Sequence, residues 1–201
     1  MTRIETSIKG DVLVARLESE DGWPRLTRAA MAEIGRIVER LGASENISGC
    51  VLAGGRKAFA VGADIEEIRR LTAIEAHEFS LAGQKTMRAI ENCRKPVVAA
   101  ICGYCMGGGL DLALACRARV ATPDAVMAHP GGALGILTGW GGTQRLAKVV
   151  GRARAKEMLL TGRRLSAAEA LGWGLVARIA ERDELLDAAL RTLGGAGGRA
   201  A

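Results

Sequence analysis

Two glycine-rich stretches constrain this chain most, because each lies where a short apolar run ends and a helix-like segment begins. The first occupies residues 54–65 and the second residues 103–111. Small residues at such a junction leave main-chain N–H groups uncovered, so an anionic oxygen can approach them closely. Two junctions of this kind can each direct one N–H at the same oxygen, which is the arrangement of an oxyanion hole. The pattern therefore favours an enzyme.

The composition is that of a soluble globular protein with an aliphatic core. Hydrophobic residues make up 49% and charged residues 25% of the 201 positions, whereas aromatic residues make up only 3%. Such scarcity argues against nucleic acid as a partner, because single-strand sites stack bases on aromatic rings. The net charge of +6 comes from basic residues spread along the chain. That distribution is too diffuse for a DNA surface but suits a small polyanionic ligand such as a nucleotide-bearing cofactor.

The cysteines and the N-terminus indicate a cytoplasmic protein. Five cysteines, an odd number, lie mostly within apolar segments, which is typical of reduced thiols. Cys102 and Cys105 form a C-x-x-C pattern, but without a second pair, small buried residues explain it better than a zinc or redox site. No apolar stretch approaches the roughly 20 residues of a membrane span, and no signal-peptide core follows Met1. We therefore expect neither a metal nor a membrane partner.

Hydrophobic periodicity predicts a single α/β domain over residues 1–193 and a disordered tail over residues 194–201. A hairpin over residues 4–17 turns at residues 9–11, and Thr27 caps the first helix. Ser166 and Glu169 form a capping box. The expected strands are residues 49–53, 97–101 and 119–121, and the expected helices are residues 28–41, 74–93, 108–116, 142–150, 153–160 and 184–193.

Four ordered motifs together resemble the crotonase (enoyl-CoA hydratase/isomerase) superfamily. They are FAVGADI at 59–65, KPVVAAICGYCMGGGLDL at 95–112, GGTQRL at 141–146 and AAEALGWGLV at 167–176. The resemblance implies an α/β fold with a ββα spiral core, an acyl-CoA substrate and assembly as a homotrimer or homohexamer. Members of the superfamily usually continue into further C-terminal helices, so we expect a shortened C-terminal helical module here.

The resemblance also assigns the site. It implies that the main-chain N–H groups of Ala63 and Gly108 hold the thioester oxygen and that Asp111 transfers protons. Asp111 follows Gly108 by three residues, so both lie on one face of a helix. The CoA moiety is expected at Val61, Asp64 and Ile65, and its phosphates at Arg25, with Arg56 and Lys57 as further candidates. No cofactor beyond the CoA of the substrate is expected.

Two departures from the superfamily leave the reaction open. The hydratases carry Glu where this chain has Asp111, which is one methylene shorter. They carry a second Glu where this chain has Gly131. Two carboxylates let one group activate water while the other delivers a proton. His129 could replace the missing group only if its side chain points inward.

Competing explanations of the glycines fail on spacing. A Rossmann fingerprint needs a third glycine where Leu112 stands, and a Walker A loop needs a lysine that is absent. Three functions stay open. They are hydration of a 2-enoyl-CoA, a one-carboxylate reaction such as double-bond isomerisation or decarboxylation of a malonyl-type CoA, and CoA binding without catalysis.

Overall fold

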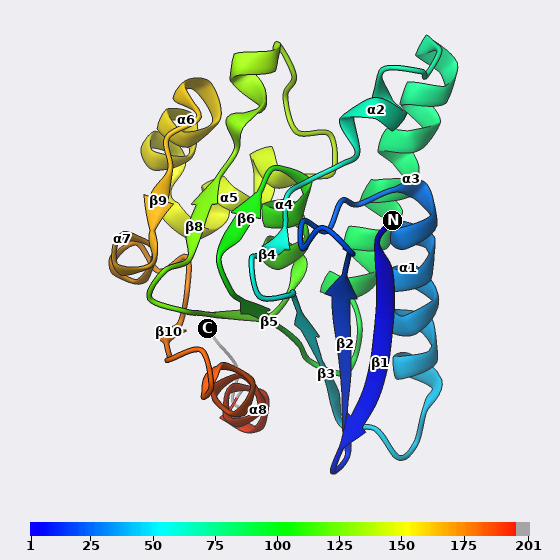
Figure 1. The fold of residues 1–201 in the computed structure, drawn as a ribbon, viewed down its shortest axis with the longest axis vertical. Helices are drawn as coiled ribbons and strands as arrows, with labels where there is room; N and C mark the ends of the chain where they lie inside the picture. The colour runs from blue at the N-terminus through cyan, green and yellow to red at the C-terminus, as the bar shows by residue number, and fades with distance from the viewer. Residues whose placement is uncertain (196–201) are drawn as a thin grey trace.

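A computed structural model describes residues 1–195 as two sheets with helices packed around them (Figure 1). In chain order the elements are β1 (Arg3–Lys9), β2 (Val12–Glu18), α1 (Arg28–Ala43), β3 (Gly49–Ala53), β4 (Ala58–Ala60), α2 (Ile65–Ile68), α3 (Ala73–Glu91), β5 (Val97–Ile101), β6 (Tyr104–Met106), α4 (Gly108–Ala115), β7 (Ala118–Ala121), β8 (Val126–Ala128), the 3₁₀ helix η1 (Pro130–Leu134), α5 (Gly142–Val150), α6 (Arg152–Thr161), β9 (Leu165–Ser166), α7 (Ala167–Gly172), β10 (Arg178–Ile179) and α8 (Leu185–Gly195).

The larger sheet has six strands in the order β1-β2-β3-β5-β7-β10. Its first two strands form the predicted hairpin, with Lys9 paired to Val12 across the turn. From β2 onward all neighbouring strands are parallel. Parallel strands need crossover connections, and here helices supply several of them, which confirms the predicted α/β fold class.

Both faces of this sheet are covered. Leu52 and Ala99 point into a cluster that includes side chains of α1, α3 and α4. Their neighbours Val51 and Val98 point the other way, into a cluster closed by α8. A strand buried on both faces is apolar at every position rather than at alternate ones. For this reason β3 and β5 were recognisable as continuous apolar runs.

A second sheet, β4-β6-β8-β9, was not predicted. Strands β4 and β6 lie inside the two glycine-rich stretches and pair in parallel, with Ala58 opposite Tyr104. Each of these strands has only three residues, too few for a period-2 pattern to emerge. The pairing brings the two glycine-rich stretches side by side.

The predicted helices are confirmed with small changes at their ends. Thr27 caps α1 by accepting a hydrogen bond from the Ala30 amide, and the Ser166–Glu169 capping box is present at α7. The last helix continues to Gly195, so the first two residues of the predicted tail are helical, and the rest of that tail lies outside the described residues. Within residues 1–195, no helix is long and apolar enough to cross a bilayer.

Candidate active site

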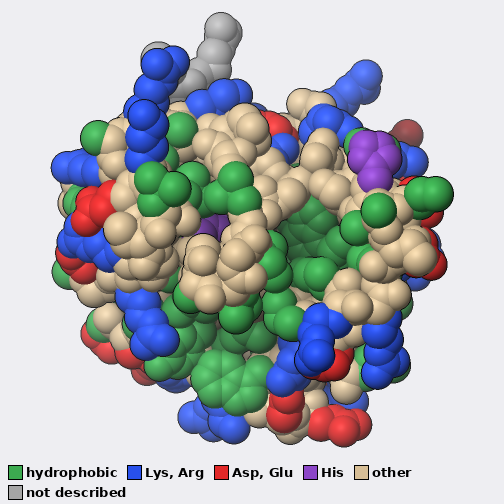
Figure 2. All heavy atoms as spheres, turned by 90° about the horizontal axis from the view of Figure 1, so that it is seen from above, with side chains coloured by type: hydrophobic (Ala, Val, Ile, Leu, Met, Phe, Trp, Pro, Cys, Tyr) green, Lys and Arg blue, Asp and Glu red, His purple; other side chains and the backbone are tan. Residues whose placement is uncertain are grey.

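An apolar cavity of about 450 Å³ opens at the ends of the two glycine-rich stretches. Figure 2 shows the molecule from above, with a hollow walled by hydrophobic side chains. Both stretches and the segment from β8 to α5 contribute to the wall. The lining residues are Val61, Gly62, Ala63, Ile65, Ile68, Leu71, Ala76, Phe79, Ser80, Gly107, Gly108, His129, Pro130, Gly131, Leu134, Ile136, Leu137, Thr138, Gly139, Trp140 and Leu159.

The main-chain nitrogens of Ala63 and Gly108 lie close together in this wall. A Cβ atom built on Gly62 would be 3.3 Å from the Gly108 nitrogen, and one built on Gly108 would be 3.4 Å from the Ala63 nitrogen. Within residues 1–195, no group accepts a hydrogen bond from either N–H. Two neighbouring free donors at a cavity wall are able to hold one oxygen between them.

Left-handed glycines produce this geometry. Gly62 has φ +101° and Gly107 has φ +52°, a region that side chains strongly disfavour. Gly107 also donates from its N–H to the Ala128 carbonyl at 2.9 Å, which ties the second stretch to β8. A Cβ on Gly109 would lie 2.3 Å from the Ala60 carbonyl oxygen. Glycine is therefore required at position 107 by the turn and at position 109 by the close approach between α4 and β4.

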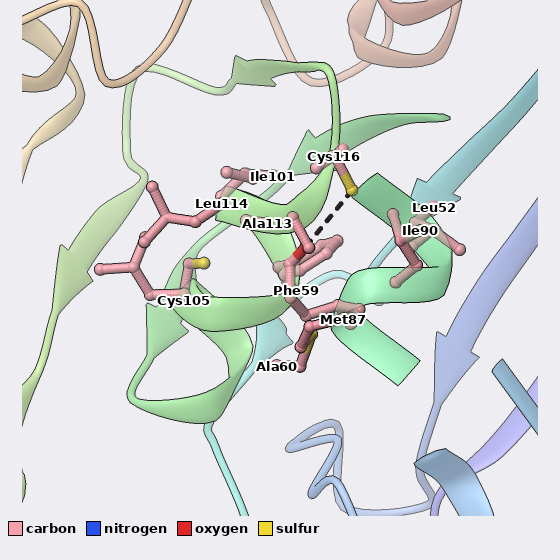
Figure 3. Packing of buried hydrophobic residues seen from close by; sticks show 14 of the residues in the cluster. Leu52, Phe59, Ala60, Met87, Ile90, Ile101, Cys105, Ala113, Leu114 and Cys116 are labelled. Atoms are coloured by element: carbon pink, nitrogen blue, oxygen red, sulfur yellow. Dashed lines mark hydrogen bonds between the residues drawn. The ribbon is translucent and has the colours of Figure 1, made fainter. Parts of the chain in front are cut away.

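Helix α4 packs within the hydrophobic core (Figure 3), and Gly108 at its N-terminus lines the cavity. Residues 109–115 of this helix are all buried. Phe59, Met87 and Cys105 belong to the surrounding cluster, and the Cys116 thiol donates to the Leu112 carbonyl at 3.3 Å. The N-terminal end of a helix carries partial positive charge, so α4 presents a fixed, favourable field to an anionic oxygen near Gly108.

Asp111 lies one turn into α4, fully buried, and is not among the cavity-lining residues. The Thr138 hydroxyl donates to its Oδ2 atom. Burial raises the pKa of Asp111 from 3.8 to about 6, while Thr138, Arg145 and the Trp140 backbone act in the opposite direction. The carboxylate thus contacts the segment before α5 rather than the open cavity.

His129 lines the cavity and lies next to Asp111. Its Nε2 atom lies 3.6 Å from Asp111 Oδ1, and its side chain is 4% exposed. The side chain points inward, which was the condition for a functional role. Burial lowers the pKa of His129 from 6.5 to about 4, so the ring is neutral at pH 7. Sequence reasoning named this residue without anticipating its pairing with Asp111.

Gly131 also lines the cavity, and its surroundings leave no room for a side chain. A Cβ built there would lie 2.5 Å from the Ile136 carbonyl oxygen. The Ile136 amide donates to the Gly131 carbonyl at 2.9 Å, which holds the two residues together. The absence of a second carboxylate is therefore built into the conformation of this segment.

Trp140 closes one side of the cavity and was missed by sequence reasoning. Its ring contacts Phe79, with centroids 5.3 Å apart, and it occupies the space above Gly83 and Gly108, where added Cβ atoms would clash with it. Both rings also line a second cavity of about 430 Å³ between α1 and α3. The pair forms a partition between two apolar cavities.

Hydrogen bonds on several sides hold the Trp140 segment in place. The Gly139 carbonyl accepts from Gln84 at 2.9 Å and from Ser80 at 3.0 Å. The Trp140 carbonyl accepts from the buried Arg145 at 3.0 Å, and Arg145 pairs with Glu91 at 2.8 Å. The partition is consequently a fixed wall.

The residues expected to bind the CoA moiety lie at the end of the first glycine-rich stretch. Val61 and Ile65 line the cavity, whereas Asp64 caps α2 by accepting hydrogen bonds from Glu66 and Glu67.

Basic residues lie within this stretch and beside it. Arg25 is half exposed and donates to Asp21 at 2.7 Å, and Lys57 donates to the Asp21 carbonyl at 3.2 Å. Arg56 is also exposed. The Leu26 amide donates to the Gly62 carbonyl at 2.8 Å, which places the neighbouring Arg25 beside the glycine-rich stretch.

Cys102 and Cys105 are buried free thiols, and burial raises the pKa of both. This is the environment of inert core cysteines. Among residues 1–195, no group of three or more His, Cys, Asp or Glu side chains is placed to hold a metal ion.

Known proteins resemble this chain in both sequence and fold. The family model described as "Enoyl-CoA hydratase/isomerase" matches residues 8–194. A short-chain-enoyl-CoA hydratase from Clostridium acetobutylicum is 35% identical over 182 residues, which cover 90% of this chain and 70% of that protein. A crotonyl-CoA hydratase from Syntrophomonas wolfei is 44% identical over 136 residues, covering 68% of this chain and 52% of that protein.

A crystal structure of enoyl-CoA hydratase from Bacillus anthracis superimposes with a TM-score of 0.90 at 34% identity. The superposition covers 96% of this chain and 75% of that one. It confirms the crotonase-like fold that the four motifs predicted. On its sequence, its fold and the extent of the match, the chain belongs to the enoyl-CoA hydratase/isomerase family of enzymes.

Proposed function

We propose that this protein acts on an acyl-CoA thioester and stabilises the enolate of that thioester between the N–H groups of Ala63 and Gly108. The observation that carries the proposal is the adjacency of these two free amides in the wall of an apolar cavity. Negative charge develops on the thioester oxygen as the enolate forms. A preorganised donor aimed at such an oxygen is worth about 3 kcal/mol in related acyl chemistry.

The acyl group would occupy the apolar cavity, and the CoA moiety would leave it past Val61 and Ile65. Arg25, Lys57 and Arg56 supply positive charge beside this exit for the CoA phosphates. Asp64 would contribute through its main chain, since its carboxylate caps α2. Nothing in this scheme requires a cofactor beyond CoA. Assembly into a homotrimer or homohexamer belongs to the same proposal.

Hydration of a 2-enoyl-CoA is the first candidate reaction, and the names of the relatives favour it. A reaction needing one proton-transferring site, such as double-bond isomerisation, is the second. One observation favours the second: Gly131 replaces the second carboxylate in a conformation that excludes a side chain. Asp111, with His129 beside it, is the remaining proton-transferring site. Decarboxylation of a malonyl-type CoA would need the two amides and no general base.

Mass spectrometry of a panel of CoA thioesters tests the proposal. Hydration adds the mass of water to crotonyl-CoA, and decarboxylation removes CO₂ from malonyl-CoA or methylmalonyl-CoA. Isomerisation of 3-enoyl-CoA leaves the mass unchanged, so it is followed by chromatographic separation of the product from authentic 2-enoyl-CoA before detection. If an excess of enzyme turned over none of these thioesters, the proposal would be contradicted. Asp111→Ala separates the reactions, because decarboxylation should survive this change and isomerisation should not.

A main-chain substitution tests the amides directly. Lactic acid in place of Ala63 replaces the N–H by an ester oxygen and keeps the methyl group. We expect a loss of about 10²- to 10³-fold in kcat, the usual cost of one oxyanion donor. The matched control is lactic acid in place of Ala155, whose N–H donates to the Gly151 carbonyl at 3.1 Å on α6. Equal activity of the two esters would contradict the assignment.

A further inference from the structure

His129 and Asp111 form a buried polar pair whose hydrogen-bonding capacity is not used by the fold. Asp111 Oδ1 and both ring nitrogens of His129 are buried without a hydrogen-bond partner among the described residues. Buried polar atoms in native structures are overwhelmingly paired, and exceptions concentrate where a ligand or a reaction uses them. Two unsatisfied groups facing each other at 3.6 Å are therefore a poor fit to a purely structural role.

The two residues differ in their access to the cavity. His129 lines it, whereas Asp111 does not. Asp111 is held from the opposite side by the Thr138 hydroxyl, and a Cβ on Gly142 would overlap its carboxylate. The carboxylate is thus enclosed between α4 and the start of α5, and in this arrangement the histidine ring is the group of the pair that meets the cavity.

We propose that His129 is the catalytic residue that exchanges a proton with the bound acyl group, and that Asp111 is the positioning residue that orients it. The inference rests on the proposed function, because it requires the thioester to lie between the Ala63 and Gly108 amides. It adds a histidine at a position that the motif comparison did not assign to catalysis. It also explains how a carboxylate outside the cavity wall can influence proton transfer.

The step balances as a proton transfer. A ring nitrogen of neutral His129 takes a proton from the α-carbon of the thioester. The electron pair of that C–H bond forms a double bond to the carbonyl carbon, and the carbonyl π pair moves to the oxygen held by the two amides. The imidazolium that forms is stabilised by ionised Asp111, which faces Nε2 and favours the tautomer with its proton there. Reversal returns a proton to the acyl group.

The other charged groups around the pair support these protonation states. Arg145 of α5 acts on Asp111 and favours its ionised form, and Glu91 of α3 balances Arg145 at 2.8 Å. Cys105 of β6 lies near Asp111, and burial raises the pKa of its thiol, so it stays protonated. At pH 7 the histidine is neutral and the carboxylate mostly ionised, which is the state that proton abstraction requires.

Exchange of α-protons in butyryl-CoA tests the proposal without knowledge of the natural reaction. The saturated ester is incubated in D₂O, and deuterium uptake is followed by mass spectrometry. We expect His129→Gln to slow uptake by at least about 10²-fold, the lower range for a general base, while calorimetry finds butyryl-CoA binding retained. The matched control is His77→Gln, since His77 is exposed on α3 and should exchange at the wild-type rate.

The pH dependence of exchange in Asp111→Asn distinguishes a positioning role of Asp111 from a purely structural one. We expect wild-type exchange to fall below about pH 6, where Asp111 gains a proton. The Asn variant should be slower than wild type at pH 7 but should not decline around pH 6. His129→Ala with added imidazole provides a second route, and partial rescue of uptake would support the proposal even if His129→Gln folds poorly.

The failures are distinguishable. Wild-type uptake with equal uptake in His129→Gln would overturn the role of His129 and leave the proposed function standing. Uptake that is lost in His129→Gln and restored by imidazole in His129→Ala supports both. Absence of uptake and of butyryl-CoA binding in the wild type would overturn the proposed function itself.

Discussion

The Nε2 atom of His129 lies 3.6 Å from the Oδ1 atom of Asp111, and both side chains are almost completely buried. Burial disfavours the charged form of each group, so their pKa values move in opposite directions. The folded-state pKa of Asp111 rises from 3.8 to about 6, and that of His129 falls from 6.5 to about 4.

These shifts predict opposite contributions to the free energy of unfolding. The contribution of Asp111 is fully present below pH 3.8 and is lost as pH rises to about 6. The contribution of His129 is fully present above pH 6.5 and is lost as pH falls to about 4. Each amounts to about 3 kcal/mol at 1.36 kcal/mol per pKa unit. In the wild type the two largely offset each other between pH 4 and 6.5.

Single variants should separate the two contributions. Relative to wild type, Asp111→Asn should lose stability as pH falls from 6.5 to 4, because only His129 then resists protonation. His129→Gln should gain stability over the same interval, because Asp111 then takes up its proton at a higher pH in the folded protein than in the unfolded chain. Urea unfolding at several pH values measures both curves. Parallel curves for the two variants would contradict the assigned pKa directions.

Thr138→Val should destabilise the protein in a pH-dependent way. The lost hydroxyl is a donor to the Asp111 carboxylate, and a hydrogen bond to a charged group contributes about 1.5–3 kcal/mol. We expect that cost at pH 8 and a smaller one at pH 4.5, where Asp111 is protonated. Thr138→Ser is the matched control, since it keeps the hydroxyl. A Val variant with the same cost at both pH values would show that the donor is not serving the ionised form.

Trp140→Ala should join the two cavities that its ring now separates. We expect kcat/KM to shift toward longer acyl-CoAs, because the second cavity of about 430 Å³ becomes continuous with the site. Stability should fall by about 3–5 kcal/mol, as for other large-to-small changes of a buried aromatic side chain. Trp173→Ala is the control, since Trp173 packs beneath Arg154 and Arg163 away from either cavity. An unchanged chain-length profile would mean that the partition does not limit the acyl group.

Gly131→Glu should not create a hydratase of the two-carboxylate type. The new Cβ would lie 2.5 Å from the Ile136 carbonyl oxygen, so the segment must shift, at a cost of about 1–3 kcal/mol. Gly131→Ala should show the same loss in thermal unfolding, while Gly172→Ala, with open space around it, should not. A Glu variant that gains crotonyl-CoA hydration at unchanged stability would refute this expectation.

Local signals in the sequence were sufficient for the elements that repeat a pattern over many residues. The apolar runs of β3 and β5, the Thr27 cap and the Ser166–Glu169 capping box all appeared where they were expected. The glycine-rich stretches also lead to the wall of the cavity, where the main-chain nitrogens of Ala63 and Gly108 lie close together. Each of the strands, caps and glycine-rich stretches is defined by residues close together in the chain.

Features that depend on distant contacts could not be predicted in the same way. The pairing of β4 with β6 joins two three-residue segments whose sequence carries no strand period. The His129–Asp111 pair and the Phe79–Trp140 partition each join residues on different elements. His129 was visible as a candidate in the sequence, but whether it pointed inward depended on where the chain between β8 and η1 lies relative to Asp111.

Two parts of the chain build the cavity wall in different ways. Ala63 and Gly108 are positioned by main-chain pairing and left-handed glycines, whereas residues 129, 131 and 140 belong to a different segment and contribute through side-chain identity or room. Under the proposed function, substitutions in that segment would change the groups that face the acyl chain and leave the two main-chain amides in place. The chain is suited to redesign by randomising a few positions on one loop, with the scaffold left untouched.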